Sequence, residues 1–236
     1  MAKITEEGSK LKEWKVWDEV PESVRRHLET ADPRYETVKK EEFEETSFRI
    51  FGVLPHKTGM IATAKKKAEE LGLQAVVLTE RQQAEAREAA KVVAAIANSI
   101  ERTGQPFKPP CVLISGGEMV VTVGNEKGIG GRNQEFVLSA ALKIEGSKNI
   151  VVASADSDGT DGPGTQLIGG KEPFCLGGGI ADGYTAERAE ELGIDIEEEL
   201  MRHNSSPVLQ KLNDGIIIEQ GISMNDLTVT AILGRS

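Results

Sequence analysis

The sequence predicts an α/β protein whose mixed or parallel sheet is flanked by helices. Apolar runs of strand length alternate with segments of helical spacing, which is typical of βα units. Glycine is unevenly distributed, with five residues before position 111 and 20 from there on. Two loops rich in glycine or aspartate also follow apolar segments, where open sheets place their ligand sites. A helix-rich part is therefore expected to precede a loop-rich α/β part.

The first part should be helical and then contain a βαβα unit with parallel strands. Residues 8–30 have helical spacing, and a second helix is expected after Pro21 because proline suits a first helical turn. The polar residues 31–47 are interpreted as a solvated face or linker. The βαβα unit comprises a strand at 48–54, a helix at 60–71, a strand at 73–78 and a helix at 80–102.

Prolines at positions 106, 109 and 110 mark a boundary before the second part of the chain. Its expected helices run from the glycine loop to about 142, then at 184–192, 196–203 and 207–212. Its expected strands are 111–115, 120–123, 150–154, 216–218 and 227–233. A loop of about 25 residues follows the strand at 150–154, and loops that long are usually functional or disordered. Gly177–Gly179 within it is interpreted as a flexible turn.

Composition excludes several classes of function. The net charge of −10 argues against non-specific nucleic-acid binding, and 4% aromatic residues argue against base-stacking surfaces. Cys111 and Cys175 have neither metal-site nor disulfide-framework spacing, which favours free thiols in a reducing compartment. No apolar run approaches the roughly 18 residues of a membrane span, and no signal peptide is visible. We therefore expect a cytoplasmic protein with neither nucleic-acid nor membrane partners.

The loop Gly124–Glu135 is the most informative feature, because four glycines precede an arginine at the expected start of a helix. Glycine lets backbone approach a ligand closely, and helix N-termini favour anions. Arg132 beside such an end would complete a phosphate or carboxylate clamp. The alternative is a tight strand–helix turn with a surface arginine.

The second feature is the acidic loop Asp156–Pro163, with three carboxylates in six residues after an expected strand. Hard cations such as Mg²⁺ prefer carboxylate oxygens, although Asp and Gly also favour plain turns. The strand-end loop Ser115–Glu118 offers a hydroxyl, two flexible N–H donors and a carboxylate. Asn225-Asp226 is explained by a simple turn.

Two nucleotide-binding motifs are absent, since Asn133 breaks the dinucleotide fingerprint and no P-loop sequence occurs. The three histidines, His27, His56 and His203, are isolated and are expected in exposed or capping roles.

Five segments in order resemble the C-terminal part of the class II glycerate kinases, whose last domain is called MOFRL. They are Ser115–Glu118, Gly130–Glu135, Asp158–Pro163, Ala181–Gly183 and Asn225–Leu227. Some members of this family carry the older name hydroxypyruvate reductase. The resemblance implies three regions: a helical interdomain segment at 1–47, a βαβα remainder of a Rossmann-like first domain at 48–108, and a MOFRL-like α/β domain at 109–236.

The resemblance implies transfer of phosphate from ATP, with Mg²⁺, to D-glycerate. Arg132 would be the catalytic residue, and Asp158 and Asp161 would contact the metal. Substrate would be bound by the other motif residues, namely Ser115, Gly116, Gly117, Glu118, Gly130, Gly131, Asn133 and Gln134. The family's upstream glycine loops and catalytic lysine have no counterpart in this sequence.

We therefore expect a kinase half that is inactive without an N-terminal domain or separate chain. The residues after Asp158–Pro163 also depart from the family pattern. Alternatives are a non-catalytic ligand-binding MOFRL module and, less favoured, a hydroxypyruvate reductase.

Overall fold

The computed structural model describes residues 6–35, 38, 40–47, 49, 52, 59–126, 128–162, 176–219 and 221–234. The chain divides into two compact units, residues 1–52 and residues 53–236. The predicted boundary near residue 108 lies inside the second unit, which therefore contains both the end of the predicted βαβα unit and the predicted MOFRL-like region.

The first unit is helical, as predicted. It contains α1 (Glu6–Glu13), α2 (Glu22–Thr30) and α3 (Lys40–Glu45), with 3₁₀ turns at Trp17–Glu19 and Pro33–Tyr35. Helix α2 begins directly after Pro21 and ends where Ala31 adopts a left-handed conformation. The predicted strand at 48–54 falls almost entirely outside the described residues.

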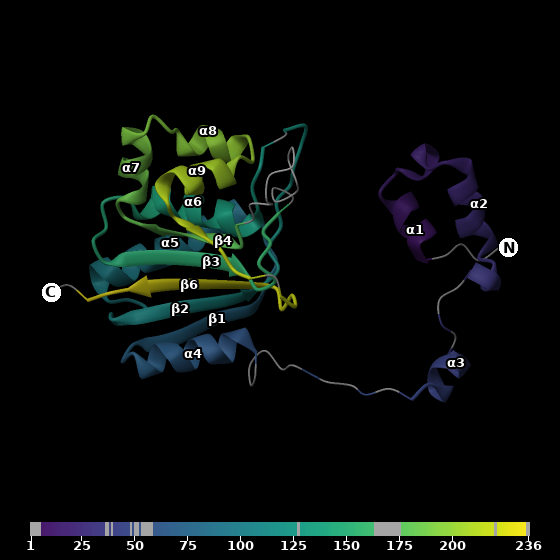
Figure 1. Cartoon of the computed structure of the whole chain (residues 1–236), viewed down its shortest axis with the longest axis horizontal. Coiled ribbons are helices and arrows are strands. Elements are labelled where there is room, and N and C mark those ends of the chain that lie inside the picture. The colour runs from purple at the N-terminus through teal and green to yellow at the C-terminus, as the bar shows by residue number, and fades with distance from the viewer. Residues whose placement is uncertain are drawn as a thin grey trace. The chain divides into compact units, whose positions relative to one another are not determined.

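The second unit is built on a six-stranded sheet in the order β1-β2-β6-β3-β4-β5 (Figure 1). Its strands are β1 (Gln74–Gln82), β2 (Cys111–Gly117), β3 (Ile150–Asp156), β4 (Gly178–Asp182), β5 (Gly215–Ile216) and β6 (Asp226–Ile232). Strands β1 and β2 are parallel, whereas the other neighbouring pairs are antiparallel. The sheet is therefore mixed. The pair of strands that the βαβα pattern predicts to be parallel includes residues 48–54, which lie almost entirely outside the described residues.

Helices cover the two faces of this sheet unequally (Figure 1). One face packs against a core formed with α5 (Ala86–Thr103), α6 (Arg132–Ile144), α7 (Thr185–Glu191), α8 (Ile196–Met201) and α9 (Ser205–Leu212). The other face contacts α4 (Met60–Glu70), through Ile61 and Ala68 against Val112 and Ile114. Successive β2 residues therefore serve two different cores, as strand alternation requires.

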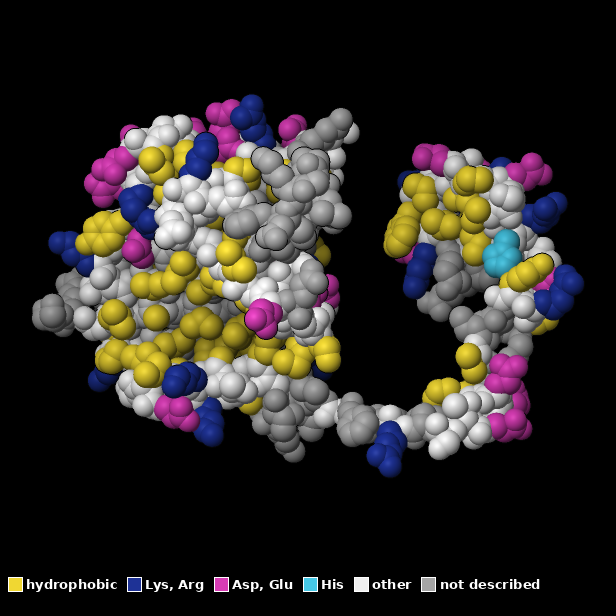
Figure 2. Space-filling model, viewed as in Figure 1, with side chains coloured by type: hydrophobic (Ala, Val, Ile, Leu, Met, Phe, Trp, Pro, Cys, Tyr) yellow, Lys and Arg dark blue, Asp and Glu magenta, His cyan; other side chains and the backbone are white. Residues whose placement is uncertain are grey.

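The face that α4 contacts stays partly open over β3, β4 and β6. Burial alternates along β3 and β6, and the less buried set is apolar, for example Ala153 and Val229. Hydrophobic side chains are visible over these strands (Figure 2), and Ile180 on β4 is 40% exposed. Among the described residues, no helix is long and apolar enough to cross a lipid bilayer.

Three predictions about local structure are wrong. Strand β1 continues to Gln82, so α5 begins at Ala86 rather than at residue 80, because the end of β1 pairs with β2. Residues 120–123 form no strand beyond one bridge between Val120 and Glu85. Gly178 and Gly179 belong to β4 instead of a flexible turn, and a Cβ on Gly178 would collide with the Ser154 backbone of β3.

Candidate functional site

Three strand ends meet at one edge of the sheet. In the antiparallel pairing, Asp226 at the start of β6 lies opposite Gly117 at the end of β2. On its other side, Asp226 lies opposite Asp156 at the end of β3. The two carboxylates are therefore direct cross-strand neighbours, and both are buried. Like charges at such positions repel, so this edge needs a cation.

Helix α6 supplies that cation from its first residue. The Arg132 Nε donates to Asp226 Oδ1 at 2.9 Å and to Oδ2 at 2.8 Å. Its Nη2 donates to Asp156 Oδ2, while Glu118 Oε1 lies farther away at 4.0 Å. The side chain of Arg132 is 22% exposed, against 2% for that of Asp226. One guanidinium thus joins β3, β6 and α6.

Burying the carboxylates of Asp156 and Asp226 beside Arg132 has an electrostatic cost. Burial raises the pKa of Asp156 above its ordinary value, although the backbone N–H of Asp158 and the charge of Arg132 oppose the shift. Breaking a buried ion pair by removing one partner leaves an uncompensated charge and costs about 3–5 kcal/mol. Arg132 therefore holds the strand ends together in addition to any role toward a ligand.

The N-terminus of α6 is capped by an internal carboxylate. Asp161 Oδ1 accepts from the backbone N–H of Asn133 at 3.1 Å, and Oδ2 accepts from that of Gln134 at 2.9 Å. Asp161 is 1% exposed. Burial raises its pKa to about 6, against the opposing effect of these hydrogen bonds. In this structure Asp161 thus takes the place that the sequence suggested for a bound anion.

Asn133 and Gln134 tie the loops of the site together from inside. The Asn133 Nδ2 donates to Asp226 Oδ1 at 2.7 Å, and its Oδ1 accepts from Ser154 Oγ at 2.5 Å. Gln134 donates to the Asp161 backbone carbonyl at 2.9 Å and accepts from Ser206 Oγ at 2.6 Å. Both side chains are fully buried. Their contacts in the described chain thus position its loops, and substrate contact stays a prediction.

The glycines before α6 are needed for close packing. Gly131 adopts an extended conformation, and a Cβ there would collide with the Asp161 backbone. A Cβ on Gly130 would meet the Ser205 hydroxyl. These two glycines therefore let the glycine loop lie against the acidic loop and the start of α9. Close packing alone is enough to explain why both positions are glycine.

The predicted Ser115–Glu118 group lies at the same sheet edge. Ser115 is buried within β2, and its carbonyl accepts from Thr228 Oγ1 at 3.4 Å. Gly116 and Gly117 follow in the strand, and Gly117 has a φ of 143°, a conformation that L side chains rarely adopt. Glu118 is more exposed than the other carboxylates near Arg132. The structure thus brings this group beside Arg132, as predicted for a shared site.

The predicted metal ligands, Asp158 and Asp161, already bind protein groups. Asp158 Oδ1 accepts from Thr160 N at 2.8 Å and Thr160 Oγ1 at 2.7 Å, forming a turn. Within the described ranges, no group of three His, Cys, Asp or Glu side chains is placed to hold a metal ion. The described residues alone therefore do not fit a preformed Mg²⁺ site.

A cavity of about 540 Å³ opens between the glycine loop and α6. Met119, Val120 and Val121 give it an apolar wall, while Arg132 and His203 line it as polar residues. This size suits a small-molecule ligand. Arg132 is thus accessible from a cavity as well as buried against its two aspartates.

His203 is buried rather than exposed, but its backbone has the capping role that the sequence allows, because its N–H donates to the Leu200 carbonyl at the end of α8. His27 is exposed as expected, and His56 lies outside the described residues. His203 is 8% exposed, and its Nδ1 lies 2.7 Å from Glu135 Oε1. Glu135 Oε2 forms an ion pair with Arg87 Nε at 3.2 Å. Glu135 is 1% exposed, and burial raises its pKa against the opposing effects of its hydrogen bond with His203 and of the charge of Arg87.

The sequence reasoning missed the central role of Asp226 and the pairing of His203 with Glu135. Asp226 was interpreted as part of a simple turn, yet it accepts hydrogen bonds from Met119, Arg132 and Asn133. A carboxylate at the first residue of an apolar central strand was the available signal. No local signal could have indicated the His203–Glu135 pair.

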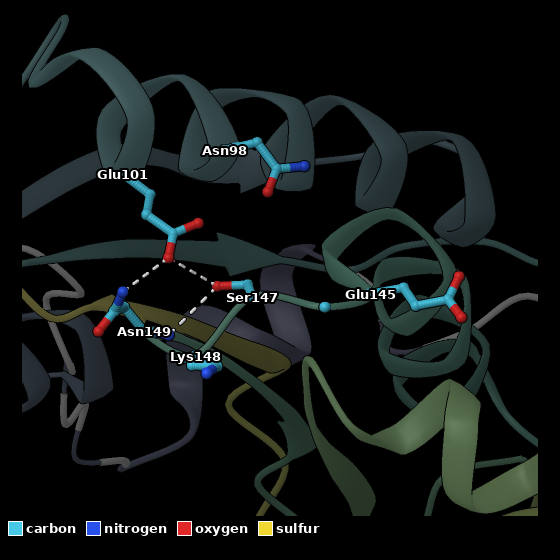
Figure 3. A pocket seen from close by; sticks show the side chains of 7 residues that line it. Asn98, Glu101, Glu145, Ser147, Lys148 and Asn149 are labelled. Atoms are coloured by element: carbon cyan, nitrogen blue, oxygen red, sulfur yellow. Dashed lines mark hydrogen bonds between the residues drawn. The ribbon is translucent and has the colours of Figure 1, made fainter. Parts of the chain in front are cut away.

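A second polar hollow lies at the opposite end of β3 (Figure 3). Glu101 Oε1 accepts from Ser147 Oγ at 3.0 Å and from Asn149 Nδ2 at 2.8 Å. Ser147 Oγ in turn accepts from the backbone N–H groups of Asn149 and Ile150, each at 3.2 Å. These contacts close the turn between α6 and β3.

Comparisons with known proteins agree with the motifs. A glycerate 2-kinase of Pyrococcus horikoshii is 34% identical over 95% of this chain and 48% of its own length. A D-glycerate 2-kinase of Thermotoga maritima is 37% identical over 84% of this chain and 46% of its own. The chain thus spans about half the length of the curated relatives it matches.

The fold agrees as well. The crystal structure of a glycerate kinase from Thermotoga maritima matches 98% of this chain and 51% of its own, with a TM-score of 0.72 and 32% identity. These matches confirm the resemblance to the glycerate kinases. The model of the MOFRL family matches residues 111–228, which include Arg132, Asp156, Asp161 and Asp226. The chain belongs to the MOFRL family.

Proposed function

We propose that this chain supplies the Arg132 side of a glycerate kinase and acts together with the further region that its relatives contain. One observation carries the proposal: three strand ends and the start of α6 converge on Arg132, which also lines a ligand-sized cavity. Family membership adds the reaction class. The proposed reaction is transfer of the terminal phosphate of ATP to D-glycerate, in the cytoplasm.

In this proposal Arg132 holds positive charge near the phosphate under transfer. Phosphoryl transfer depends chiefly on positioning and on stabilising the charge that develops on the phosphate oxygens. Asp156 and Asp226 fix the guanidinium plane through its Nε and Nη2, which leaves Nη1 without a hydrogen bond to the described residues. ATP with its bound Mg²⁺ is a substrate of the proposed reaction.

A reconstitution assay tests the proposal. The chain is mixed with the region of the Pyrococcus horikoshii relative that it does not match, and ADP formation is followed with ATP, Mg²⁺ and D-glycerate. We expect D-glycerate-dependent ADP formation from the mixture only. The proposal is wrong if neither the mixture nor a covalent fusion of the two regions consumes ATP.

Arg132→Lys sharpens this test, because it keeps the positive charge but loses the bidentate fork toward the aspartates. We expect kcat to fall by about 100-fold, as for loss of an oriented charge at a transition state. Lys148→Arg, at the opposite end of β3, is the matched control and should leave kcat unchanged. Near-normal turnover of Arg132→Lys would show that Arg132 is structural.

A non-catalytic ligand-binding module is the second candidate, favoured by the pairing of Arg132 with two aspartates and by the half-length coverage. Calorimetry with ATP–Mg²⁺, glycerate and phosphoglycerate separates the two, since binding without turnover in any reconstitution supports the module. A reductase is less favoured because the dinucleotide fingerprint is absent, and lack of NAD(P)H binding would exclude it.

A further inference from the structure

The cavity beside Arg132 contains a second polar group that the proposed function does not use. His203 follows α8 and has a φ of 55°, so its backbone is held in a conformation that is uncommon for non-glycine residues. His203 lines the cavity together with Arg132 and Glu135. Arg132 and Glu135 are three residues apart on α6, so they share one helix face.

Glu135 fixes the orientation of the imidazole ring. With the proton on Nδ1, this atom donates to Oε1 of the buried carboxylate across the 2.7 Å that separates them. Nε2 is then left with a lone pair, and it makes no hydrogen bond to the described residues. A carboxylate that orients a histidine through Nδ1 also stabilises the imidazolium that forms when Nε2 accepts a proton.

The second carboxylate oxygen of Glu135 faces the protein interior. Glu135 Oε2 is buried and accepts no hydrogen bond from the described residues, although it lies 3.2 Å from Arg87 Nε. This ion pair anchors Glu135 behind His203, so the carboxylate orients the ring from the protein interior.

We propose that this cavity binds the hydroxyl end of the acceptor alcohol and that His203 Nε2 accepts the proton of the attacking hydroxyl. The inference rests on the proposed kinase function for the identity of the ligand. The ligand class is a small hydroxy acid. Its attacking hydroxyl faces His203, beside the phosphate that lies near Arg132 in the proposed kinase reaction.

The proposed step transfers the terminal phosphate of ATP to the acceptor hydroxyl. The O–H bond of the acceptor breaks and its proton moves to Nε2, while the freed oxygen forms a bond to the terminal phosphorus of ATP. The bond between that phosphorus and the bridging oxygen of ATP breaks, and ADP leaves with the electron pair. Glu135 is the positioning residue, because it contacts His203 and its charge offsets the imidazolium.

Kinetics of the reconstituted kinase provide the first test. His203→Asn removes Nε2 but retains a residue that tolerates positive φ. We expect kcat to fall by about 100-fold with KM changed by less than about 3-fold, as for loss of a general base. His27→Gln, in the first unit, is the matched control and should change neither constant. Melting curves verify that each variant is folded.

The pH profile distinguishes a proton acceptor from a packing residue. Protonation of His203 should lower kcat at acidic pH, and this acid limb should disappear in His203→Asn. The charged groups around the ring are Glu135 and Arg132 on α6, Arg87 on α5 and Glu126 in the cavity loop. Glu135→Gln should reduce kcat and displace the limb, whereas Glu135→Asp should partly restore it. An unchanged kcat and profile in His203→Asn would overturn the inference and leave the kinase function intact.

If no reconstituted mixture consumes ATP, the proposed function is wrong. NMR of the chain alone then tests whether the cavity binds a hydroxy acid. The histidine ring signals are titrated with D-glycerate and with propionate, which has a carboxylate but no hydroxyl. A saturable shift of the His203 signal with D-glycerate alone supports the hydroxyl site. An unmoved signal, or an equal shift with propionate, overturns it.

Discussion

The two ends of strand β3 both place a carboxylate against a turn, yet they do so in different ways. At one end, Glu101 accepts hydrogen bonds from Ser147 and Asn149, which are both neutral donors on a partly exposed surface. At the other end, Asp156 and Asp226 are buried side by side and share the guanidinium of Arg132. The hydrogen bonds of Glu101 close a turn, whereas the contacts of Asp156 and Asp226 with Arg132 bring three charged groups together.

This difference separates what the fold needs from what a functional site adds. A turn can be closed with neutral donors, as Ser147 shows, so a fold of this kind does not require a buried ion cluster. Replacing buried ion pairs by apolar residues is often neutral or stabilising when all partners change together. A cluster that couples three strand ends to a ligand-sized cavity is therefore better explained by a function than by stability.

The largest expected effect comes from Arg132. Arg132→Met leaves two adjacent buried carboxylates without a cation, so we expect the free energy of unfolding to fall by about 3–5 kcal/mol. Urea denaturation followed by circular dichroism measures the change. The triple change Arg132→Met, Asp156→Asn, Asp226→Asn should recover much of the loss, because the uncompensated charges are removed. A decrease in the free energy of unfolding below about 1 kcal/mol for Arg132→Met would show that the two buried carboxylates do not depend on the charge of Arg132.

Much of the sheet and the position of Arg132 could be predicted from the sequence. The apolar runs at 111–115 and 150–154 are continuous, and they lie at the centre of β2 and β3. The change from glycines to helical spacing locates the start of α6 at Arg132 itself. These signals are local, because they depend on residues that are neighbours in sequence.

The remainder depends on contacts between distant residues. Asp226 and Asp156 become neighbours only through the register of β6 against β3, and the His203–Glu135 pair spans 68 positions. Strand β4 was missed because three consecutive glycines resemble a turn, while packing against β3 requires the small size of Gly178. The Asp161 cap was missed for a related reason, since a helix N-terminus alone does not reveal which carboxylate fills it.

The next effect concerns the pH dependence of stability through Asp161. Its folded-state pKa of about 6 lies above the unfolded value of about 3.9, so the folded state binds the proton more tightly. The contribution of protonated Asp161 to the free energy of unfolding is therefore fully present below pH 4, and it is lost as pH rises through 6. The loss amounts to about 3 kcal/mol, at about 1.4 kcal/mol per pKa unit.

Asp161→Asn isolates this contribution, because the amide does not titrate while Asp156 and Glu135 remain in both proteins. Relative to the wild type, the variant should gain about 3 kcal/mol of stability between pH 4 and pH 7. Chemical denaturation at a series of pH values measures the difference. A difference that stays constant with pH would show that hydrogen bonds from α6 outweigh the burial of the carboxylate.

The smallest effect is expected at the Glu101 end. Glu101→Gln keeps one carbonyl oxygen for Ser147 and Asn149, so only the charge is lost and we expect a change below about 1 kcal/mol. Glu101→Ala removes the acceptor for both hydrogen bonds and should cost about 1–2 kcal/mol, because Ser147 and Asn149 are only part-buried and water replaces some of the contact. Neither variant should alter turnover in the reconstituted kinase, since this turn is at the far end of β3 from Arg132. Loss of turnover in a stably folded Glu101→Gln protein would contradict the assignment of this end of the sheet to structure alone.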